Sequence, residues 1–212
     1  MTFDFPEING SFRFECTLCG DCCTGDQEVL LNPFDLYRMA RFLRYPSTRQ
    51  LFAQQWVELV PDPEHSVWRP RIKFKTHPFK FCPFLINEMD DSGQLKGLCQ
   101  LHPEFKPLVC FLAPVGCRYD AKRRTTQFLL VPPTQDCPGM EAGKENDLQE
   151  YLAEFEEALH FQEMFFEILQ EVKDLLLPPE RFLKELYAFP TDAPFAEVFS
   201  RLLTSLRSRL NT

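Results

Sequence analysis

A loop that holds four cysteines constrains this chain more than any other feature. The stretch FECTLCGDCC, positions 14–23, contains Cys16, Cys19, Cys22 and Cys23. The spacing C-x2-C-x2-C lets three thiolates from one tight loop converge on a single centre. Gly20 permits the sharp turn and lets backbone N–H groups approach sulfur. The loop is therefore typical of four kinds of site: a disulfide staple, a redox switch, a zinc knuckle or the cradle of an iron–sulfur cluster.

A disulfide framework is the least favoured of these. The chain has nine cysteines, and an odd number cannot pair completely within one molecule. The first residues, MTFDFPEING, have neither the basic nor the apolar segment of a signal peptide. No apolar run approaches the ~20 residues that span a bilayer. We therefore expect a cytoplasmic protein, with no membrane partner, whose thiols stay reduced.

The charge of the chain disfavours nucleic acid as a partner. The formal net charge is −8, and a field of this sign repels a phosphate backbone. The one basic run, Lys122-Arg123-Arg124, is short and is typical of a solvated turn. Protein partners remain open.

The remaining cysteines favour iron–sulfur over zinc. In ferredoxin loops with this spacing, a remote Cys followed by Pro completes a four-iron cluster, and Cys82-Pro83 and Cys137-Pro138 are two such pairs. Zinc ribbons instead use two C-x2-C knuckles, and this chain has no second knuckle. Five cysteines stand singly: Cys82, Cys99, Cys110, Cys117 and Cys137. The pattern favours a [4Fe-4S]-type cluster, with zinc as the alternative.

Cys23 complicates the count of centres. We expect the side chains of adjacent residues to diverge, so Cys22 and Cys23 are poor ligands for one mononuclear ion. Cys23 then faces a second centre or is structural. With four ligands for each centre, the sequence allows one cluster or two.

The order of elements predicts an α+β fold, mainly α. Residues 1–140 form an irregular cysteine-bearing domain with short strands and helices, and a helical segment at 144–212 packs on it. In the first part we expect strands at 12–14, 68–75 and 125–131 and helices at 33–43 and 48–60. In the second part, apolar periodicity predicts a long helix from 148 that stops before Pro178, and two further helices at 178–189 and 193–210.

The cysteine pattern resembles a known family. The loop FECTLCGDCC, followed by CPFL…GLCQLHPEFKPLVC, is similar to the YkgJ-type CxxCxxCC proteins, which are described as zinc- or iron-chelating. The resemblance covers about positions 12–137 and does not extend to the C-terminal helices. It implies a set of eight ligands: Cys16, Cys19, Cys22, Cys23, Cys82, Cys99, Cys110 and Cys137. Cys117 is surplus to that set.

Two positions depart from the family pattern. Lys106-Pro107 stands where the family usually has Arg-Pro, so the planar fork of an arginine is missing. His102 stands where a tyrosine is common. His102 lies three residues after Cys99 and is a further candidate ligand, although a hydrogen-bonded structural histidine is commoner.

Three functions remain open at this point. The first is a cytoplasmic metal-centre protein with one or two [4Fe-4S]-type clusters, a redox role and a redox or other protein partner. The second is a structural zinc module whose helical tail docks a partner. The third is a cluster-dependent protein-modifying enzyme, because flagellin lysine N-methylase has similar cysteines. No Ser-His-Asp or paired-carboxylate pattern indicates a hydrolase.

Overall fold

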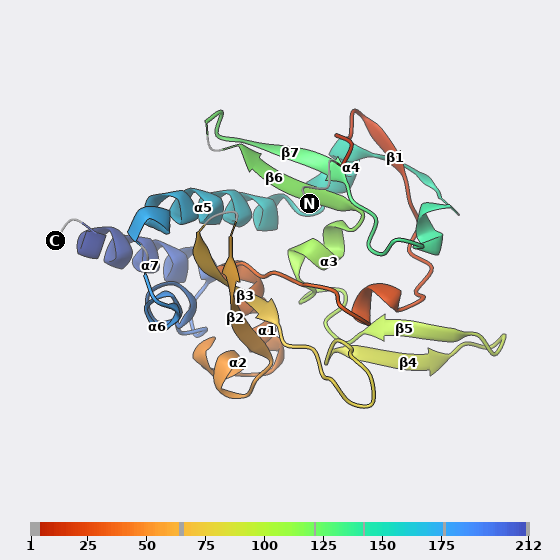
Figure 1. Cartoon of the computed structure of the whole chain (residues 1–212), viewed down its shortest axis with the longest axis horizontal. Helices are drawn as coiled ribbons and strands as arrows, with labels where there is room; N and C mark the ends of the chain where they lie inside the picture. The colour runs from red at the N-terminus through yellow and green to blue at the C-terminus, as the bar shows by residue number, and fades with distance from the viewer. Residues whose placement is uncertain (1–4, 64–65, 121, 142, 176, 211–212) are drawn as a thin grey trace.

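The fold is mixed α+β with helices predominating, as the sequence predicts. The computed structural model describes residues 5–63, 66–120, 122–141, 143–175 and 177–210. Helices take up 37% of the chain and strands 24%. Most helices lie on one side of the molecule, with the β2–β3 hairpin (57–72) among them and the β4–β5 hairpin (85–99) on the opposite side (Figure 1).

The helices of the described residues are α1 (Pro33–Phe42), α2 (Arg49–Ala53), α3 (Leu108–Leu112), α4 (Leu148–Ala153), α5 (Glu156–Val172), α6 (Pro179–Phe182) and α7 (Phe195–Leu210). Shorter helical turns are η1 (Asp21–Cys23), η2 (Pro138–Met140), η3 (Lys173–Leu175) and η4 (Leu183–Tyr187). The strands form antiparallel pairs: β1 (Ser11–Arg13) with β8 (Glu145–Asp147), β2 (Val57–Asp62) with β3 (Val67–Ile72), β4 (Leu85–Met89) with β5 (Leu95–Cys99), and β6 (Val115–Asp120) with β7 (Thr125–Leu130).

Helix α1 begins where the sequence predicts. The Asn32 side chain accepts from the Asp35 amide at 2.8 Å, and the Asp35 carboxylate accepts from the Asn32 amide at 3.0 Å. This capping box satisfies two donors that a helix start leaves open, and Pro33 at the first position needs no donor partner. The expected helix at 33–43 is therefore confirmed.

The helix expected at 48–60 is wrong in its second half. Helix α2 ends at Ala53, and Val57–Asp62 is strand β2, paired with β3. Gln55 has a φ of 58°, which stops the helix, and the β-branched residues Val57 and Val60 then suit a strand. The long helix expected from 148 is also interrupted, because Phe155 has non-helical dihedral angles between α4 and α5.

Aromatic rings fill the main core. The Phe34 ring of α1 lies 5.0 Å from the Phe161 ring of α5 and 5.0 Å from the Phe195 ring of α7, and Phe161 and Phe195 are 4.7 Å apart. Ring pairs at this separation add to the burial of apolar area. These three phenylalanines thus pack α1, α5 and α7 together, and no cysteine takes part in these ring contacts.

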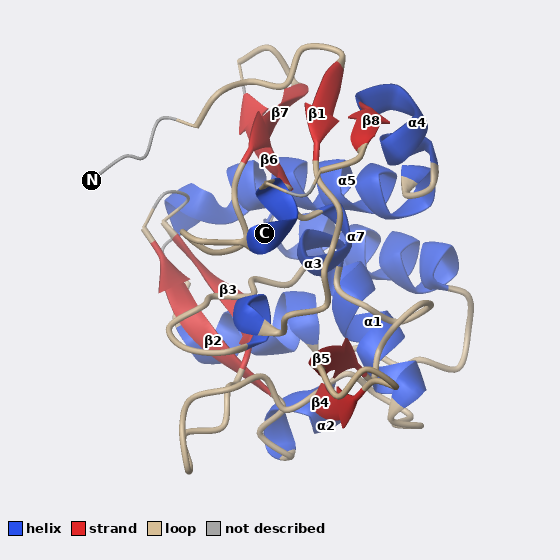
Figure 2. Cartoon of the chain, turned by 90° about the vertical axis from the view of Figure 1, so that its right-hand side faces the viewer, coloured by secondary structure: helices blue, strands red, loops and turns tan. Residues whose placement is uncertain are grey.

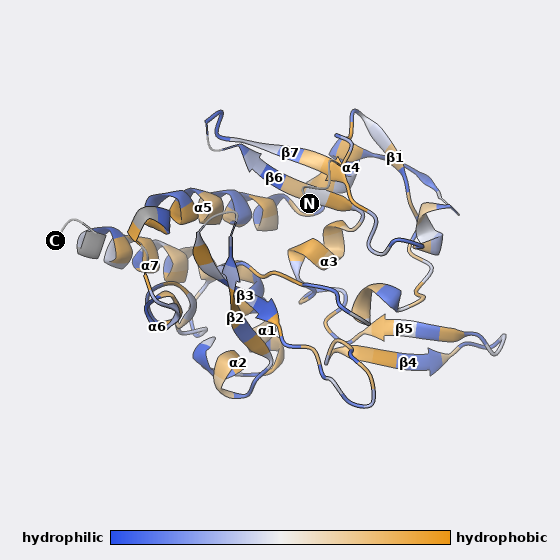
Figure 3. Cartoon of the chain, viewed as in Figure 1, coloured by the Kyte–Doolittle hydropathy of each residue, from blue (hydrophilic) through white to orange (hydrophobic). Residues whose placement is uncertain are grey.

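Turn η1 and the β4–β5 hairpin, which carry several of the cysteines, lie away from α5 and α7 (Figure 1). The β4–β5 hairpin projects from the body, and the orange-red turn η1 lies along it (Figure 1). Helix α3 lies between the hairpin and β6, and it is apolar along its whole length (Figure 3). No helix in the described part of the chain is both long and apolar enough to cross a membrane.

The N-terminal part and the helical segment meet at several places besides the aromatic core, two of them close to the boundary between the parts. Strand β1 pairs with β8, and the two lie side by side in Figure 2. The Tyr151 hydroxyl of α4 donates to the Phe111 carbonyl at 2.9 Å, at the end of α3. The division into 1–140 and 144–212 stays a prediction, and the chain on both sides of it contributes to the same packed core.

Candidate metal centre

Two glycines bring the four-cysteine loop onto the β4–β5 hairpin. The Gly97 amide of β5 donates to the Leu18 carbonyl at 2.7 Å. A Cβ atom on Gly97 would lie 2.5 Å from the Gly20 Cα, so the two backbones cross where only glycine fits. Gly20 also has a φ of 82°, which favours glycine and directs the chain into η1. Sequence analysis identified Gly20 but missed Gly97, which stands two residues before Cys99.

Five thiols gather beside this crossing. Each of them interacts electrostatically with several of the others: Cys22, Cys23, Cys82, Cys99 and Cys110. We call these residues the inner thiol group. They come from four separate segments, namely η1, the loop after β3, the end of β5 and α3. All nine cysteines of the chain are free thiols.

Cys22 and Cys23 point to the same side, contrary to the divergence expected from the sequence. Their sulfur atoms are 3.9 Å apart. The reason is η1, because successive residues of a 3-10 helix are about 120° apart, whereas those of a strand alternate between faces. Two thiolates on one tetrahedral zinc ion, with Zn–S bonds of about 2.3 Å, would be at a similar separation, roughly 3.8 Å. The expected divergence of the two side chains is therefore wrong, and whether Cys23 serves a second centre or is structural stays a prediction.

The Cys22–Cys23 pair shares its protons unequally. A hydrogen bond from Cys23 lowers the pKa of the Cys22 thiol, opposed by burial and helped by the positive charge of Lys106. The same hydrogen bond, together with burial, raises the pKa of Cys23. This hydrogen bond thus favours the thiolate form of Cys22 and the protonated form of Cys23.

Backbone amides point at two further sulfur atoms. The amides of Phe84 and Leu85 donate to the Cys82 sulfur, although burial is the larger effect and raises the pKa of Cys82 to about 12. The amides of Leu101 and His102 approach the Cys99 sulfur in the same way, and burial again raises the pKa. Amide donors of this kind stabilise a thiolate bound to a metal and tune the potential of an iron–sulfur cluster.

Lys106 provides positive charge close to three members of the group. Its charge lowers the pKa of Cys22, Cys99 and Cys110, and burial opposes it with a larger effect on each of the three. Its ammonium nitrogen lies 5.5 Å from the centre of the Phe111 ring. Lys106 thus supplies positive charge beside these thiols without the planar fork of an arginine.

The other three predicted ligands lie outside the inner thiol group. Cys16 and Cys137 flank the place where the Glu15 amide donates to the Gly139 carbonyl at 3.1 Å. A Cβ atom on Gly139 would lie 2.5 Å from the Glu15 oxygen, so this approach also requires glycine. Cys19 interacts with Thr17 and Asp21, and burial raises its pKa.

Cys117 and His102 occupy different surroundings. Cys117 is on β6, opposite Phe128 of β7, and burial together with the charge of Glu163 raises its pKa to about 12. The His102 ring packs 6.0 Å from the Phe111 ring, and its amide donates to the Cys99 carbonyl. The inner thiol group therefore contains neither residue.

The thiols fit a metal centre in their chemistry, but not as a preformed cage for one ion. Over the described residues, no three His, Cys, Asp or Glu side chains are arranged to hold a single metal ion. Soft thiolates, amide donors and a nearby cation are nevertheless the donor set that zinc and iron–sulfur clusters share. The residues fit a zinc ion or an iron–sulfur cluster if the thiols move closer together when it binds.

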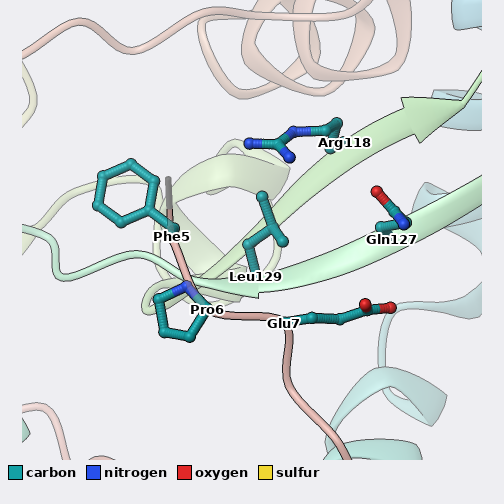
Figure 4. Close-up of a pocket in the computed structure, with 6 residues that line it drawn as sticks. All are labelled: Phe5, Pro6, Glu7, Arg118, Gln127 and Leu129. Carbon is teal, nitrogen blue, oxygen red and sulfur yellow. The ribbon is translucent and has the colours of Figure 1, made fainter. Parts of the chain in front are cut away.

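A hollow elsewhere in the molecule has no such chemistry. It has a volume of about 390 Å³ and lies between the N-terminal segment and the β6–β7 hairpin. Arg118 and Gln127 project over it from neighbouring strands (Figure 4). Its lining contains no thiol and no histidine: Phe5, Pro6, Glu7, Arg118, Gln127 and Leu129. The inner thiol group is therefore the stronger candidate site.

Comparison with known proteins gives no match: no family model, no curated protein and no solved structure is similar to this chain.

Proposed function

We propose that the protein binds a [4Fe-4S]-type cluster through its cysteines and functions in a reducing compartment as a metal-centre protein with a redox role. One observation carries the proposal. Five thiols from four segments far apart in the chain lie within range of electrostatic interaction with one another, and Lys106 acts on three of them. Thiols that only filled a core would have no reason to gather, because an isolated buried cysteine behaves as a small apolar residue.

The inner thiol group supplies the ligands of the first centre. It offers one sulfur more than a four-ligand cluster needs. Cys22 and Cys23, whose sulfurs are adjacent, are the two that would compete for one ligand position. Cys16, Cys19 and Cys137 are the ligands left for a second centre. The resemblance to the YkgJ-type proteins supports the same eight residues.

One observation favours a cluster over zinc: the inner thiol group is not built from two C-x2-C knuckles. When bound, a cluster would supply one-electron transfer. Around it, Lys106 would offset negative charge, and the amides at Cys82 and Cys99 would stabilise the bound thiolates.

A matched pair of substitutions tests the ligand set. We expect Cys110→Ser to lose more than half of the bound metal, because its thiol belongs to the inner thiol group. Cys117→Ser should keep full metal content, since Cys117 lies on β6 beside Glu163. Metal is measured as iron, zinc and acid-labile sulfide per chain after purification without oxygen. Equal losses in the two variants would show that Cys117 is a ligand.

The resemblance to flagellin lysine N-methylase supports a second candidate, a cluster-dependent protein-modifying enzyme. Such an enzyme binds S-adenosylmethionine, and equilibrium dialysis with the labelled compound measures this binding directly. Saturable binding to the metal-loaded chain favours the enzyme, and its absence leaves the metal-centre protein. A chain with one zinc ion and no sulfide would instead indicate the structural zinc module.

A further inference from the structure

We propose that Asp35 and Arg38 of α1 are positioning residues that fix the segment carrying Cys110 in the inner thiol group. This inference rests on the proposed function for its importance, but its geometry can be tested without metal. We call the two residues the α1 clamp.

Asp35 caps a helix other than its own. Its Oδ1 accepts from the Leu108 amide at 2.8 Å, and its Oδ2 accepts from the Asn32 amide at 3.0 Å. Leu108 is the first residue of α3, and Cys110 follows two residues later. One carboxylate thus serves the start of α1 and the start of α3 together, and the side chain is almost completely buried.

Arg38 holds the same segment four residues earlier. Its guanidinium donates through Nε to the Glu104 carbonyl at 2.8 Å, and Nη2 donates to the same oxygen. The guanidinium carbon lies 5.5 Å from the centre of the Phe34 ring and 5.6 Å from that of Phe111. The Arg38 guanidinium therefore lies between its own helix and α3. It holds the backbone at Glu104, just before Lys106 and Pro107.

Helix α3 needs outside support because it cannot stand alone. It has five residues, and Pro107 at its N-cap has no side chain that accepts a hydrogen bond. A helix this short is unstable in isolation, and an uncapped start leaves amide donors unpaired. Asp35 supplies the acceptor that the local sequence lacks. Leu108 and Leu112 then bury their side chains on either side of Cys110.

The members of the inner thiol group are therefore held in place by different contacts. Cys110 is fixed through α3 to the aromatic core of α1, α5 and α7. The four-cysteine loop and the β4–β5 hairpin are held instead by the contact between Gly20 and Gly97. A cluster that binds between them would join a thiol already held by the core to thiols on more independent segments. Removing the clamp should free Cys110 selectively.

Thiol labelling of the full-length chain tests this directly. The reduced, chelated protein is treated with a small alkylating agent, and the rates at Cys110 and Cys82 are compared by peptide mass spectrometry. Loss of a buried hydrogen bond to a carboxylate should raise the Cys110-to-Cys82 rate ratio roughly tenfold in Asp35→Ala. Arg38→Gln should raise the ratio in the same direction and less. Asp35→Asn has one accepting oxygen for the two amides of Asn32 and Leu108, so it should raise the ratio less than Asp35→Ala does.

Met39→Ala is the matched control. Met39 is fully buried on the same helix, so the variant loses stability, but its side chain has no oxygen that could hold the Leu108 amide. It should raise both labelling rates and leave the ratio unchanged. A flat ratio in Asp35→Ala and in Arg38→Gln, or an equal rise in Met39→Ala, overturns the clamp. If Asp35→Ala does not fold, Arg38→Gln and Asp35→Asn still decide.

Failure of the clamp and failure of the proposed function are distinguishable. If wild-type protein purified without oxygen contains neither iron nor zinc while the ratio still rises, the metal proposal fails and the clamp stands. If the metal is bound and the ratio stays flat, the clamp fails and the metal proposal stands.

Discussion

Asp35 shows how one buried carboxyl group links two helices. Burial raises its pKa to about 6, in spite of the amides of Asn32 and Leu108 and the charges of Arg38 and Arg69, all of which favour the ionised form. An ordinary Asp has a pKa near ~4. The folded state therefore holds this proton more tightly than the unfolded chain does.

This shift predicts a stability change with pH that belongs to Asp35. Between about pH 4 and pH 6 the folded state binds more protons at this site, so the contribution of Asp35 to stability falls as pH rises. The difference in free energy of unfolding, wild type minus Asp35→Asn, should fall by on the order of 2–3 kcal/mol from pH 4 to pH 7. Denaturant titrations of the two proteins side by side measure it. A difference that rises with pH, or does not change, would contradict the assigned pKa.

Single residues also mark where prediction from sequence stopped. Asn32, Pro33 and Asp35 predicted the start of α1, because capping depends on near neighbours. The second hydrogen bond of Asp35, to Leu108, joins residues far apart in the chain and left no local signal. The orientation of Cys22 and Cys23 depended on whether their turn is helical or extended, which the four-cysteine spacing did not show.

Among the elements, the crossing of the four-cysteine loop with β5 is the most sensitive to side-chain size. The contact that a Cβ atom on Gly97 would make with the Gly20 Cα, 2.5 Å, involves backbone on both sides and cannot be relieved by a rotamer. We expect Gly97→Ala to push the loop away and cost about 2 kcal/mol of stability. It should also lose more than half of the bound metal.

Lys96→Ala is the control for this substitution. Lys96 is the neighbour of Gly97 on β5, and its ion pair with Asp90, at 3.7 Å, is partly exposed. Such a pair contributes little, so stability should change by less than about 0.5 kcal/mol and metal content should stay full. Thermal unfolding and metal analysis check both variants. Gly97→Ala with normal metal content would show that the crossing does not position the thiols.

At the level of elements, prediction succeeded where the signal was local and periodic. The helix at 33–43 and the strands at 68–75 and 125–131 appeared as α1, β3 and β7. The strand Val57–Asp62 was missed, because its apolar residues continue the pattern of α2 and its pairing with β3 is what makes it a strand. The crossing of β5 with the loop is tertiary, so the position of the hairpin against η1 could not be predicted.

In the whole molecule, the aromatic contacts between helices and the inner thiol group lie in different elements. The contacts of Phe34, Phe161 and Phe195 involve no cysteine, whereas the inner thiol group joins loops and a projecting hairpin. Structural metal can contribute on the order of 10 kcal/mol to folding, comparable to the whole stability of a domain. Loss of the metal should therefore destabilise mainly the loops that carry the thiols.

Chelation of the bound metal tests whether the loops depend on metal more than the helices do. After removal of metal we expect helical circular dichroism to persist in large part, since α1, α5 and α7 pack on one another. Protease cuts should concentrate between Cys23 and Cys137, in the loops that precede Cys82 and follow Cys99. If the chain instead unfolds throughout in one cooperative step, the helical segment belongs to the same folding unit as the thiols.

The most direct test of the account is the metal and sulfide content of protein purified without oxygen. We expect brown protein with broad absorption near ~400 nm, from charge transfer between thiolate and iron, and with iron and acid-labile sulfide in equal amounts. Cys110→Ser, processed in parallel, should lose most of this absorption, and Cys117→Ser should keep it. Colourless wild-type protein with stoichiometric zinc and no sulfide would contradict the iron–sulfur assignment.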